Sequence, residues 1–226
     1  MGDLLRATWA IAAKDVLLEF RSRTAFVSAL VFTALFLAIF NFARDPTAVS
    51  AIDLAPGILW ITFTFAAMLG LNRAFALERE NRALDGLLLS PASRTAIYLG
   101  KVVANLVFVG LVEAVALPLF ALFFNVPVLP VLGPLVLVIA LATLGFVAVG
   151  TLMSSMAVNT RLAELMLPVL LLPFLVPPVT SAVQITARLF AGRPFSEVTA
   201  WLRLLVAYDI IFVTACILFF ASTIEE

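Results

Sequence analysis

Long apolar stretches separated by short polar ones dominate this chain, and six of them are long enough to cross a membrane. A membrane-spanning helix needs about 20 consecutive, mostly apolar residues. The candidate stretches cover residues 24–43, 54–72, 102–124, 128–158, 162–187 and 204–224. The pattern predicts an all-α membrane protein with six transmembrane helices.

The first 23 residues follow a different pattern, one typical of a helix that lies in the membrane surface. Leu5, Trp9, Ala12, Val16 and Phe20 recur at helical spacing, and charged residues occupy the other faces. We expect an interfacial amphipathic helix here, the alternative being a plain anchor without a partner contact. Acids and bases are mixed throughout this segment, so we do not expect a cleaved signal peptide.

Residues 73–101, between the second and third stretches, hold eight of the 28 acidic and basic residues. An apolar stripe beside a polar face predicts a helix that ends at Ser90-Pro91, because a residue before proline avoids helical geometry. Ser93 is placed to cap the helix that becomes the third span. We interpret the segment as a coupling helix that docks on a cytoplasmic ATPase, the alternative being a helix on lipid headgroups. The candidate coupling residues are Glu78, Arg79, Glu80, Arg82, Asp85, Leu88, Pro91 and Lys101.

Four prolines interrupt the fifth stretch and are candidates for gating: Pro168, Pro173, Pro177 and Pro178. A proline inside a helix removes an amide donor and clashes with the preceding turn. We therefore expect the fifth span to end near Val176, followed by a short re-entrant helix over 179–190 on the outer side. Ser196 would then cap the sixth span. The alternative is one kinked span over 162–187.

The distribution of positive charge predicts the orientation of the chain. Ten of the 14 Lys and Arg residues lie in segments on the same side as the N-terminus. By the positive-inside rule, both termini are expected in the cytoplasm. Charged residues make up only 12% of the chain, against about 25% in soluble domains, so lipid is the expected solvent. The net charge of zero does not indicate a nucleic-acid partner, and nothing divides 1–226 into more than one domain.

The residues that usually carry catalysis are scarce. The chain has no histidine, and Cys216 is its one cysteine, which we interpret as a packing residue. Gly100-Lys101 is the one Gly-Lys pair, but Thr95 stands where a phosphate-binding loop needs its first glycine. We therefore expect no catalytic residues, no metal site and no directly bound cofactor.

Two acids lie within predicted spans and away from their ends, Glu113 in the third and Asp209 in the sixth. Intramembrane acids are costly and usually face a bundle interior or a cavity. Either residue can serve substrate or conformational control, or can act as a hydrogen-bonded link between helices. Trp9, Trp60 and Trp201 are expected to anchor the chain at the membrane interfaces.

These features together resemble ABC-2-type transporter permeases and, within that class, the CcmB family of haem exporter permeases in cytochrome c maturation. The inner loop carries the resemblance to the wider class, and the proline-rich fifth span together with Leu88-Leu89-Ser90-Pro91 carries that to the haem family. The segments concerned are Lys14-Asp15, Glu19, residues 21–23, Glu78 and Glu80 with residues 87–91, Tyr98-Leu99-Gly100-Lys101, and residues 167–173.

The resemblance implies a permease that works inside a larger complex in a bacterial inner membrane. Its implied partners are a cytoplasmic ABC ATPase subunit that binds ATP, a haem-handling membrane protein, a small helper subunit and a second copy of the chain. The complex would release a haem-loaded chaperone or export haem on the outer side. The absence of histidine favours a mechanical role over direct haem carriage.

Two other functions fit the same sequence. An ABC-2 permease could export another substrate, such as a glycan lipid or a drug, and a neighbouring ATPase gene without cytochrome assembly genes would favour it. A non-ABC membrane assembly scaffold would instead bind no ATPase.

Overall fold

Helices make up nearly all of the described structure, a computed structural model that covers residues 2–45, 50–80, 92–157 and 163–223. In chain order its α-helices are α1 (Gly2–Ser22), α2 (Thr24–Ala43), α3 (Ala51–Glu80), α5 (Arg94–Phe124), α6 (Leu132–Ala157), α7 (Ala163–Phe190) and α8 (Thr199–Thr223). The 3-10 turns η1 (Leu129–Val131) and η2 (Phe195–Glu197) precede α6 and α8. Of the described helices, six are long and apolar enough to cross a membrane, which confirms the predicted class.

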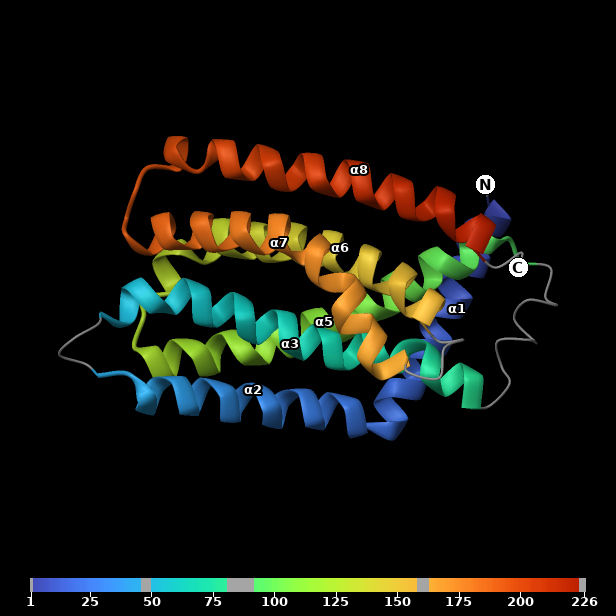
Figure 1. The fold of residues 1–226 in the computed structure, drawn as a ribbon, viewed down its shortest axis with the longest axis horizontal. Coiled ribbons are helices and arrows are strands. Elements are labelled where there is room, and N and C mark those ends of the chain that lie inside the picture. Colours follow the sequence, from blue (N-terminus) through green and yellow to red (C-terminus); the bar gives the residue numbers. More distant parts are fainter. Residues whose placement is uncertain (1, 46–49, 81–91, 158–162, 224–226) are drawn as a thin grey trace.

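The six long helices run side by side, and both chain termini lie at the same end of the bundle (Figure 1). We call this the terminal end and the opposite one the far end. Helices α3 and α6 are central: 61% and 67% of the residues in their most apolar stretches are buried. In α2 and α8 the corresponding share is 22%, because these two helices flank the bundle. Helix α1 lies across the terminal end and meets α2 at a sharp turn (Figure 1).

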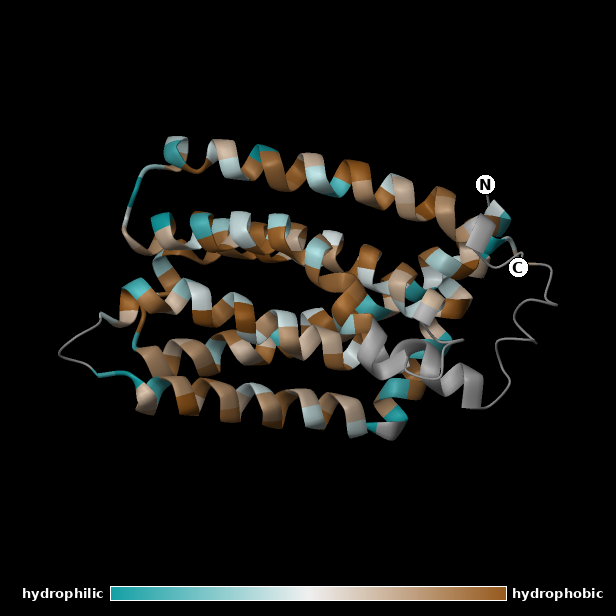
Figure 2. Cartoon of the chain, viewed as in Figure 1, coloured by the Kyte–Doolittle hydropathy of each residue, from teal (hydrophilic) through white to brown (hydrophobic). Residues whose placement is uncertain are grey.

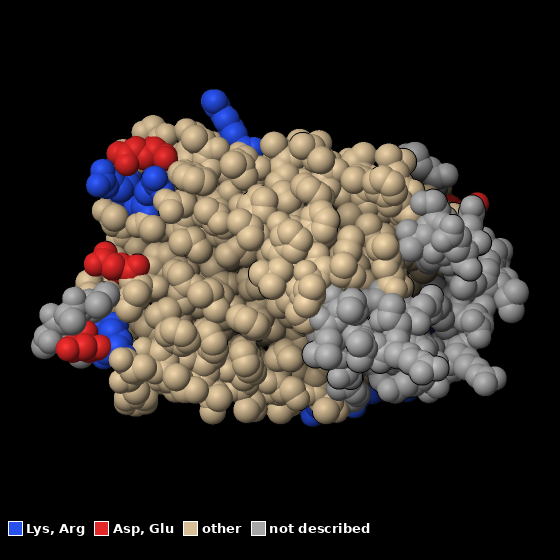
Figure 3. Space-filling model, viewed as in Figure 1, with Lys and Arg blue, Asp and Glu red and all other residues tan. Residues whose placement is uncertain are grey.

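The surface of the bundle is that of a membrane protein. Apolar residues colour the long helices along most of their length, and hydrophilic ones gather toward their ends (Figure 2). In the space-filling view, charged side chains leave a broad band free of charge in the middle of the visible face (Figure 3). Large apolar side chains such as Val31, Val169 and Ile210 are exposed, as expected where lipid tails replace water.

The two larger clusters of buried side chains in the described ranges fill opposite halves of the bundle. The cluster nearer the terminal end includes Leu71, Tyr98 and Phe220, and the cluster nearer the far end includes Trp60 and Phe120. Trp60 is buried, and its indole N–H donates to Thr186 Oγ1 at 2.9 Å. The prediction that Trp60 anchors at an interface was therefore wrong, because its side chain points toward α7 instead of lipid.

The fifth span corrects a second prediction. Helix α7 is continuous from Ala163 to Phe190 and contains all four prolines, so Pro177-Pro178 does not end it and no separate re-entrant helix follows. Figure 1 shows α7 changing direction along its length, which agrees with the alternative of one kinked span.

Helix α7 continues past its prolines because another helix supplies a donor to a carbonyl that proline leaves without one. In a regular helix the amide of residue 178 would bond the carbonyl of Phe174, but proline has no such amide. The Tyr208 hydroxyl of α8 donates to that carbonyl at 2.8 Å instead. Membrane helices tolerate proline where neighbouring helices satisfy the freed groups in this way.

The start of the sixth span also differs from the prediction. Ser196 lies within η2 and does not cap α8, which begins at Thr199. The Thr199 hydroxyl donates to the Ser196 carbonyl at 2.8 Å. Ser196 belongs to the backbone turn Phe195–Glu197 instead of capping α8, and in that turn the Glu197 N–H donates to the Pro194 carbonyl at 3.0 Å.

Candidate functional site

The third span begins at the cap that the sequence predicts. Ser93 has extended backbone geometry, and its hydroxyl accepts a bond from the Ala96 amide at 3.2 Å. Helix α3 extends to Glu80, so the backbone at Glu78, Arg79 and Glu80 is helical, as expected for the start of the loop. The side chains of these three residues lie outside the described part of the structure, as do Arg82, Asp85, Leu88 and Pro91 altogether.

Lys101 is the candidate coupling residue whose surroundings the structure describes. Its side chain is almost fully buried, at 2% exposure, and its ammonium lies 2.8 Å from Asp15 Oδ2 of α1. Asp15 Oδ1 also meets Lys14 Nζ at 3.0 Å, on the exposed side. Removing one partner of a buried ion pair typically costs about 3–5 kcal/mol. Lys101 is thus placed to hold α1 against α5.

Gly100 allows the two helices to come close. A Cβ atom at this position would lie 2.8 Å from Cβ and Cγ2 of Ile11 and 3.0 Å from the Thr8 carbonyl oxygen. Real Cβ atoms almost never make contacts below 3.0 Å, and here one contact partner is backbone. Any larger residue would therefore push α1 away from α5 and separate Asp15 from Lys101.

Tyr98 connects the same turn of α5 to two further helices. Its hydroxyl donates to the Ala148 carbonyl of α6 at 2.9 Å, and its ring centroid lies 5.0 Å from that of Phe220 on α8. The short segment 98–101 therefore contacts α1, α6 and α8 together. We call Ile11, Asp15, Tyr98, Gly100 and Lys101 the α1–α5 joint.

The amphipathic N-terminal helix is confirmed as a helix, but the face it buries differs from the predicted stripe. Ala12 is buried and Ile11 beside it packs against α5, whereas Leu5, Trp9 and Phe20 are exposed. Burial of Ile11 follows from the close approach at Gly100, which no periodicity within α1 reveals. The exposed apolar residues leave α1 with a face suited to the membrane interface.

Within the spans, Glu113 of α5 has a partner on α6. The Thr143 hydroxyl donates to Glu113 Oε1 at 2.7 Å, and the acid is buried. Glu113 and Thr143 also line an open groove of about 470 Å³ between α5 and α6, beside the small residues Gly110 and Ala114. The bond joins two neighbouring helices, as expected for a polar link inside a membrane.

Asp209 of α8 has different surroundings. It is buried, and neither carboxylate oxygen has a hydrogen-bond partner among the residues that the structure describes. Its side chain lies over Gly145 of α6, where an added Cβ would collide with Asp209 Oδ1 and come within 2.9 Å of the Tyr208 ring. The two acids therefore lie against different residues of α6, Glu113 at Thr143 and Asp209 at Gly145, and they do not form one site.

The sequence did not single out Asp15, Thr143 and Gly145 as site residues on their own chemistry. Asp15 appeared only within a motif, because a surface acid next to Lys14 looks solvated until α5 is placed over it. Thr143 and Gly145 are ordinary residues of an uncharged span, and only their neighbours distinguish them. In the described ranges, no three His, Cys, Asp or Glu side chains gather closely enough to hold a metal ion.

Comparisons with known proteins place the chain in a family. The family model described as "CcmB protein" matches residues 6–225. Heme exporter protein B of Pseudomonas aeruginosa is 29% identical over 87% of this chain and 88% of its own length. Its counterparts from Rhodobacter capsulatus and Paracoccus denitrificans are each 30% identical, over 79% and 81% of this chain and 82% and 84% of theirs. With nearly its whole length matched, the chain belongs to the CcmB family.

Proposed function

We propose that this chain is the membrane permease subunit of an ABC-type complex in cytochrome c biogenesis. It transmits ATP hydrolysis in a partner subunit to haem delivery on the outer side, as haem export or as release of a haem-loaded chaperone. The family match and the shared name of its relatives, heme exporter protein B, support the haem branch over a glycan-lipid or drug exporter. The chain is a transport subunit and not an enzyme in this proposal.

In the proposed assembly, two copies of the chain each form one permease domain. Their partners are a cytoplasmic ABC ATPase that binds ATP, a haem-handling membrane protein and a small helper subunit. The terminal end faces the cytoplasm of a bacterial inner membrane, because ten of 14 Lys and Arg residues belong to segments on that side. Haem is handled by the complex, and this chain holds no cofactor itself.

The α1–α5 joint is the observation that carries the coupling role. Helix α3 ends at Glu80 and α5 begins at Arg94, both at the terminal end (Figure 1), and the connection between them in the sequence holds the candidate coupling residues Arg82, Asp85, Leu88 and Pro91. A force on that connection reaches α5 at Ser93, and the buried Lys101–Asp15 pair passes it to α1. Tyr98 carries it to α6 through the bond to the Ala148 carbonyl.

Two lysines that share Asp15 provide a matched test. Lys101→Met breaks the buried contact, and Lys14→Met breaks the exposed one, a kind of ion pair that contributes at most about 1 kcal/mol. Each variant replaces the chain in its own host, and holocytochrome c, membrane level of the chain and co-purified ATPase are measured. We expect Lys101→Met to retain the ATPase but lose most holocytochrome c, and Lys14→Met to match wild type.

Charge reversal at Glu78 or Glu80 and the change Pro91→Leu test the docking end of the same path. They should lower holocytochrome c at an unchanged level of the chain. Normal holocytochrome c in these variants and in Lys101→Met would rule out the coupling role. A chain that co-purifies with an ATPase but with no cytochrome assembly protein would favour another exporter, and one that binds no ATPase would favour a scaffold.

A further inference from the structure

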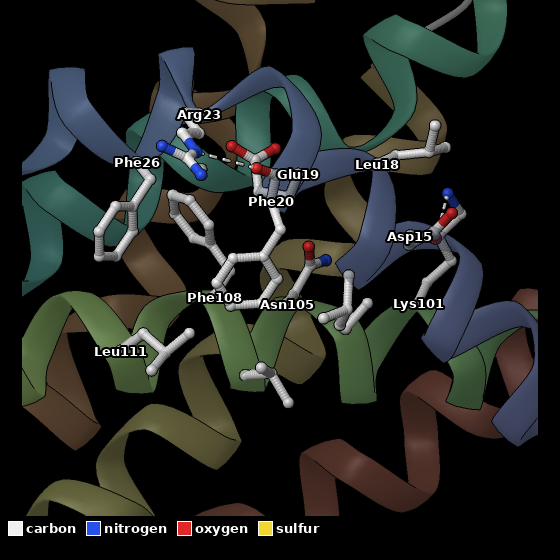
Figure 4. Close-up of a pocket in the computed structure, with 14 residues that line it drawn as sticks. Asp15, Leu18, Glu19, Phe20, Arg23, Phe26, Lys101, Asn105, Phe108 and Leu111 are labelled. Atoms are coloured by element: carbon white, nitrogen blue, oxygen red, sulfur yellow. Dashed lines mark hydrogen bonds and ion pairs between the residues drawn. The ribbon is translucent and has the colours of Figure 1, made fainter.

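A groove on the outside of the bundle runs between α5 and α6, and Glu113 and Thr143 border it. It extends from Leu106 to Leu117 on α5, about 16 Å of helix at 1.5 Å per residue. The groove shares no lining residue with the cavity between α1 and α5 that Figure 4 shows. Val136 on its α6 edge is half exposed, so the groove opens toward the surrounding lipid.

Small residues keep this groove open. Gly110 and Ala114 line it from α5, and Ala140 lines it from α6. A Cβ at Gly110 would meet no described atom within 4 Å, whereas Gly145 and Gly150 lie against side chains of α8 and α3. The packing among the described residues therefore does not use the space at Gly110. In membranes, small residues at a helix surface let the backbone of another helix approach closely.

Glu113 gives the groove its one carboxyl group, near the middle of the membrane. Phe124 ends α5 about 16 Å further along, which is about half the thickness of a hydrocarbon core. The acid is only 6% exposed, and its Oε1 accepts from the Thr143 hydroxyl. A carboxyl group has two oxygens, and Oε2 has no hydrogen bond with a described residue. The groove therefore offers a polar atom at a depth where water is scarce.

Three kinds of occupant can reach a groove that opens on lipid. An acyl chain has no polar group at this depth, so it would leave Oε2 without a hydrogen bond. A second copy joined groove to groove would place one Glu113 carboxyl group against the other. A transmembrane helix of another protein can carry an amide or hydroxyl side chain, which bonds a carboxyl group whether or not that group holds a proton. The chemistry at Glu113 favours such a helix.

We propose that this groove docks one transmembrane helix of a partner protein. Small residues of that helix lie on Gly110 and Ala114, and an Asn, Gln, Ser or Thr side chain at mid-membrane bonds Glu113 Oε2. This binding surface lies apart from the α1–α5 joint, and it does not depend on which molecule the complex transports.

Two synthetic transmembrane peptides serve as probes, with the same Leu- and Ala-rich sequence and either Asn or Leu at the centre. The full chain is placed in lipid vesicles with a fluorophore on a C-terminal tag, and energy transfer to labelled peptide measures binding. Gly110→Val fills the groove. Gly57→Val is the matched control on α3, because a Cβ there also meets no described atom within 4 Å. Glu113→Leu removes the carboxyl group.

Wild type and Gly57→Val should bind the Asn peptide about fivefold more tightly than the Leu peptide, as one interhelical hydrogen bond predicts. Gly110→Val should bind neither peptide, and Glu113→Leu should bind both alike. Equal affinity of wild type for the two peptides, or no binding of either, overturns the proposal. A loss of binding that Gly57→Val shares with Gly110→Val overturns the groove as the site.

Photo-crosslinking in host membranes tests the same surface inside the complex. Benzoylphenylalanine replaces Val136 at the groove edge or, as a control, the exposed Ile210 of α8. The Val136 probe should link to a membrane segment of another protein with an amide or hydroxyl residue at mid-membrane, and Gly110→Val should remove the link. The Ile210 probe should not form this link. Adducts with lipid alone, or with a second copy of the chain, overturn the proposed occupant.

Discussion

Two buried acids, Glu113 and Asp209, look alike in the sequence and differ in the structure. Each is the lone acid of an apolar stretch, and each packs against α6. Glu113 accepts a bond from Thr143, whereas both Asp209 oxygens lack a hydrogen-bond partner among the described residues. Glu113 borders an open groove in which Thr143 is the one other polar lining residue, whereas Asp209 lies against Gly145 and Tyr208.

The difference separates a stabilising contact from a costly one. An interhelical bond such as that of Glu113 contributes about 1 kcal/mol in a membrane protein. A buried acid without a partner lowers stability, and proteins keep such groups mainly where function needs them. We therefore predict that Glu113 holds α5 on α6, and that Asp209 marks a contact between α6 and α8 that opens during the proposed transport cycle. Four substitutions test this contrast.

The largest effect is expected at Gly145. Gly145→Val places side-chain atoms against Asp209 and Tyr208, and overpacking of this kind should lower the free energy of unfolding by about 3 kcal/mol. Thermal unfolding in one detergent, followed by circular dichroism, measures the loss. Gly110→Val is the matched control, because a Cβ at Gly110 meets no atom within 4 Å. Equal stability of the two variants would contradict the packing at Asp209.

Asp209→Leu should act in the opposite direction. It removes two oxygens that lack partners among the described residues, so we expect the free energy of unfolding to rise by about 2 kcal/mol. Holocytochrome c formation in cells should fall at the same time, because the contact between α6 and α8 would open less readily. A variant that is less stable than wild type would show that Asp209 has a partner in the membrane.

Thr143→Val should have a smaller effect, a loss of about 1 kcal/mol, because Glu113 loses its donor while the shape of the side chain is kept. Thr143→Ser retains the hydroxyl and serves as the control in the same unfolding assay. If the two variants unfold together, the bond seen at 2.7 Å contributes nothing to stability.

Glu113→Gln should have the smallest effect, below about 0.5 kcal/mol, since the amide oxygen still accepts from Thr143. Holocytochrome c should also stay near the wild-type level if Glu113 only links helices. A normal unfolding curve together with lost holocytochrome c would instead assign Glu113 to substrate or conformational control.

Much of the fold was predictable because apolar length decides membrane spans directly. The six spans and the cap at Ser93 follow from local chemistry, and both agree with the structure. Pro177-Pro178 was misleading because the rule that proline ends helices considers one helix only. The hydroxyl that satisfies the Phe174 carbonyl comes from Tyr208, 34 positions away.

The candidate site divides in the same way. Local pattern identified the charged connection over 73–101 and the two intramembrane acids, and the role of residues 81–91 stays a prediction because they lie outside the described ranges. The pattern did not show that Lys101 turns inward. A lysine near a helix start usually lies at the surface, and only the packing of α1 across α5 buries it against Asp15.

Composition and local motifs are enough to establish that this protein lies in lipid, how many spans it has and which family it belongs to. Packing between helices decides which acid is hydrogen-bonded, which lysine is buried and how α7 stays helical across its prolines. Those outcomes depend on side chains supplied by other helices, whose distance along the chain no local pattern encodes.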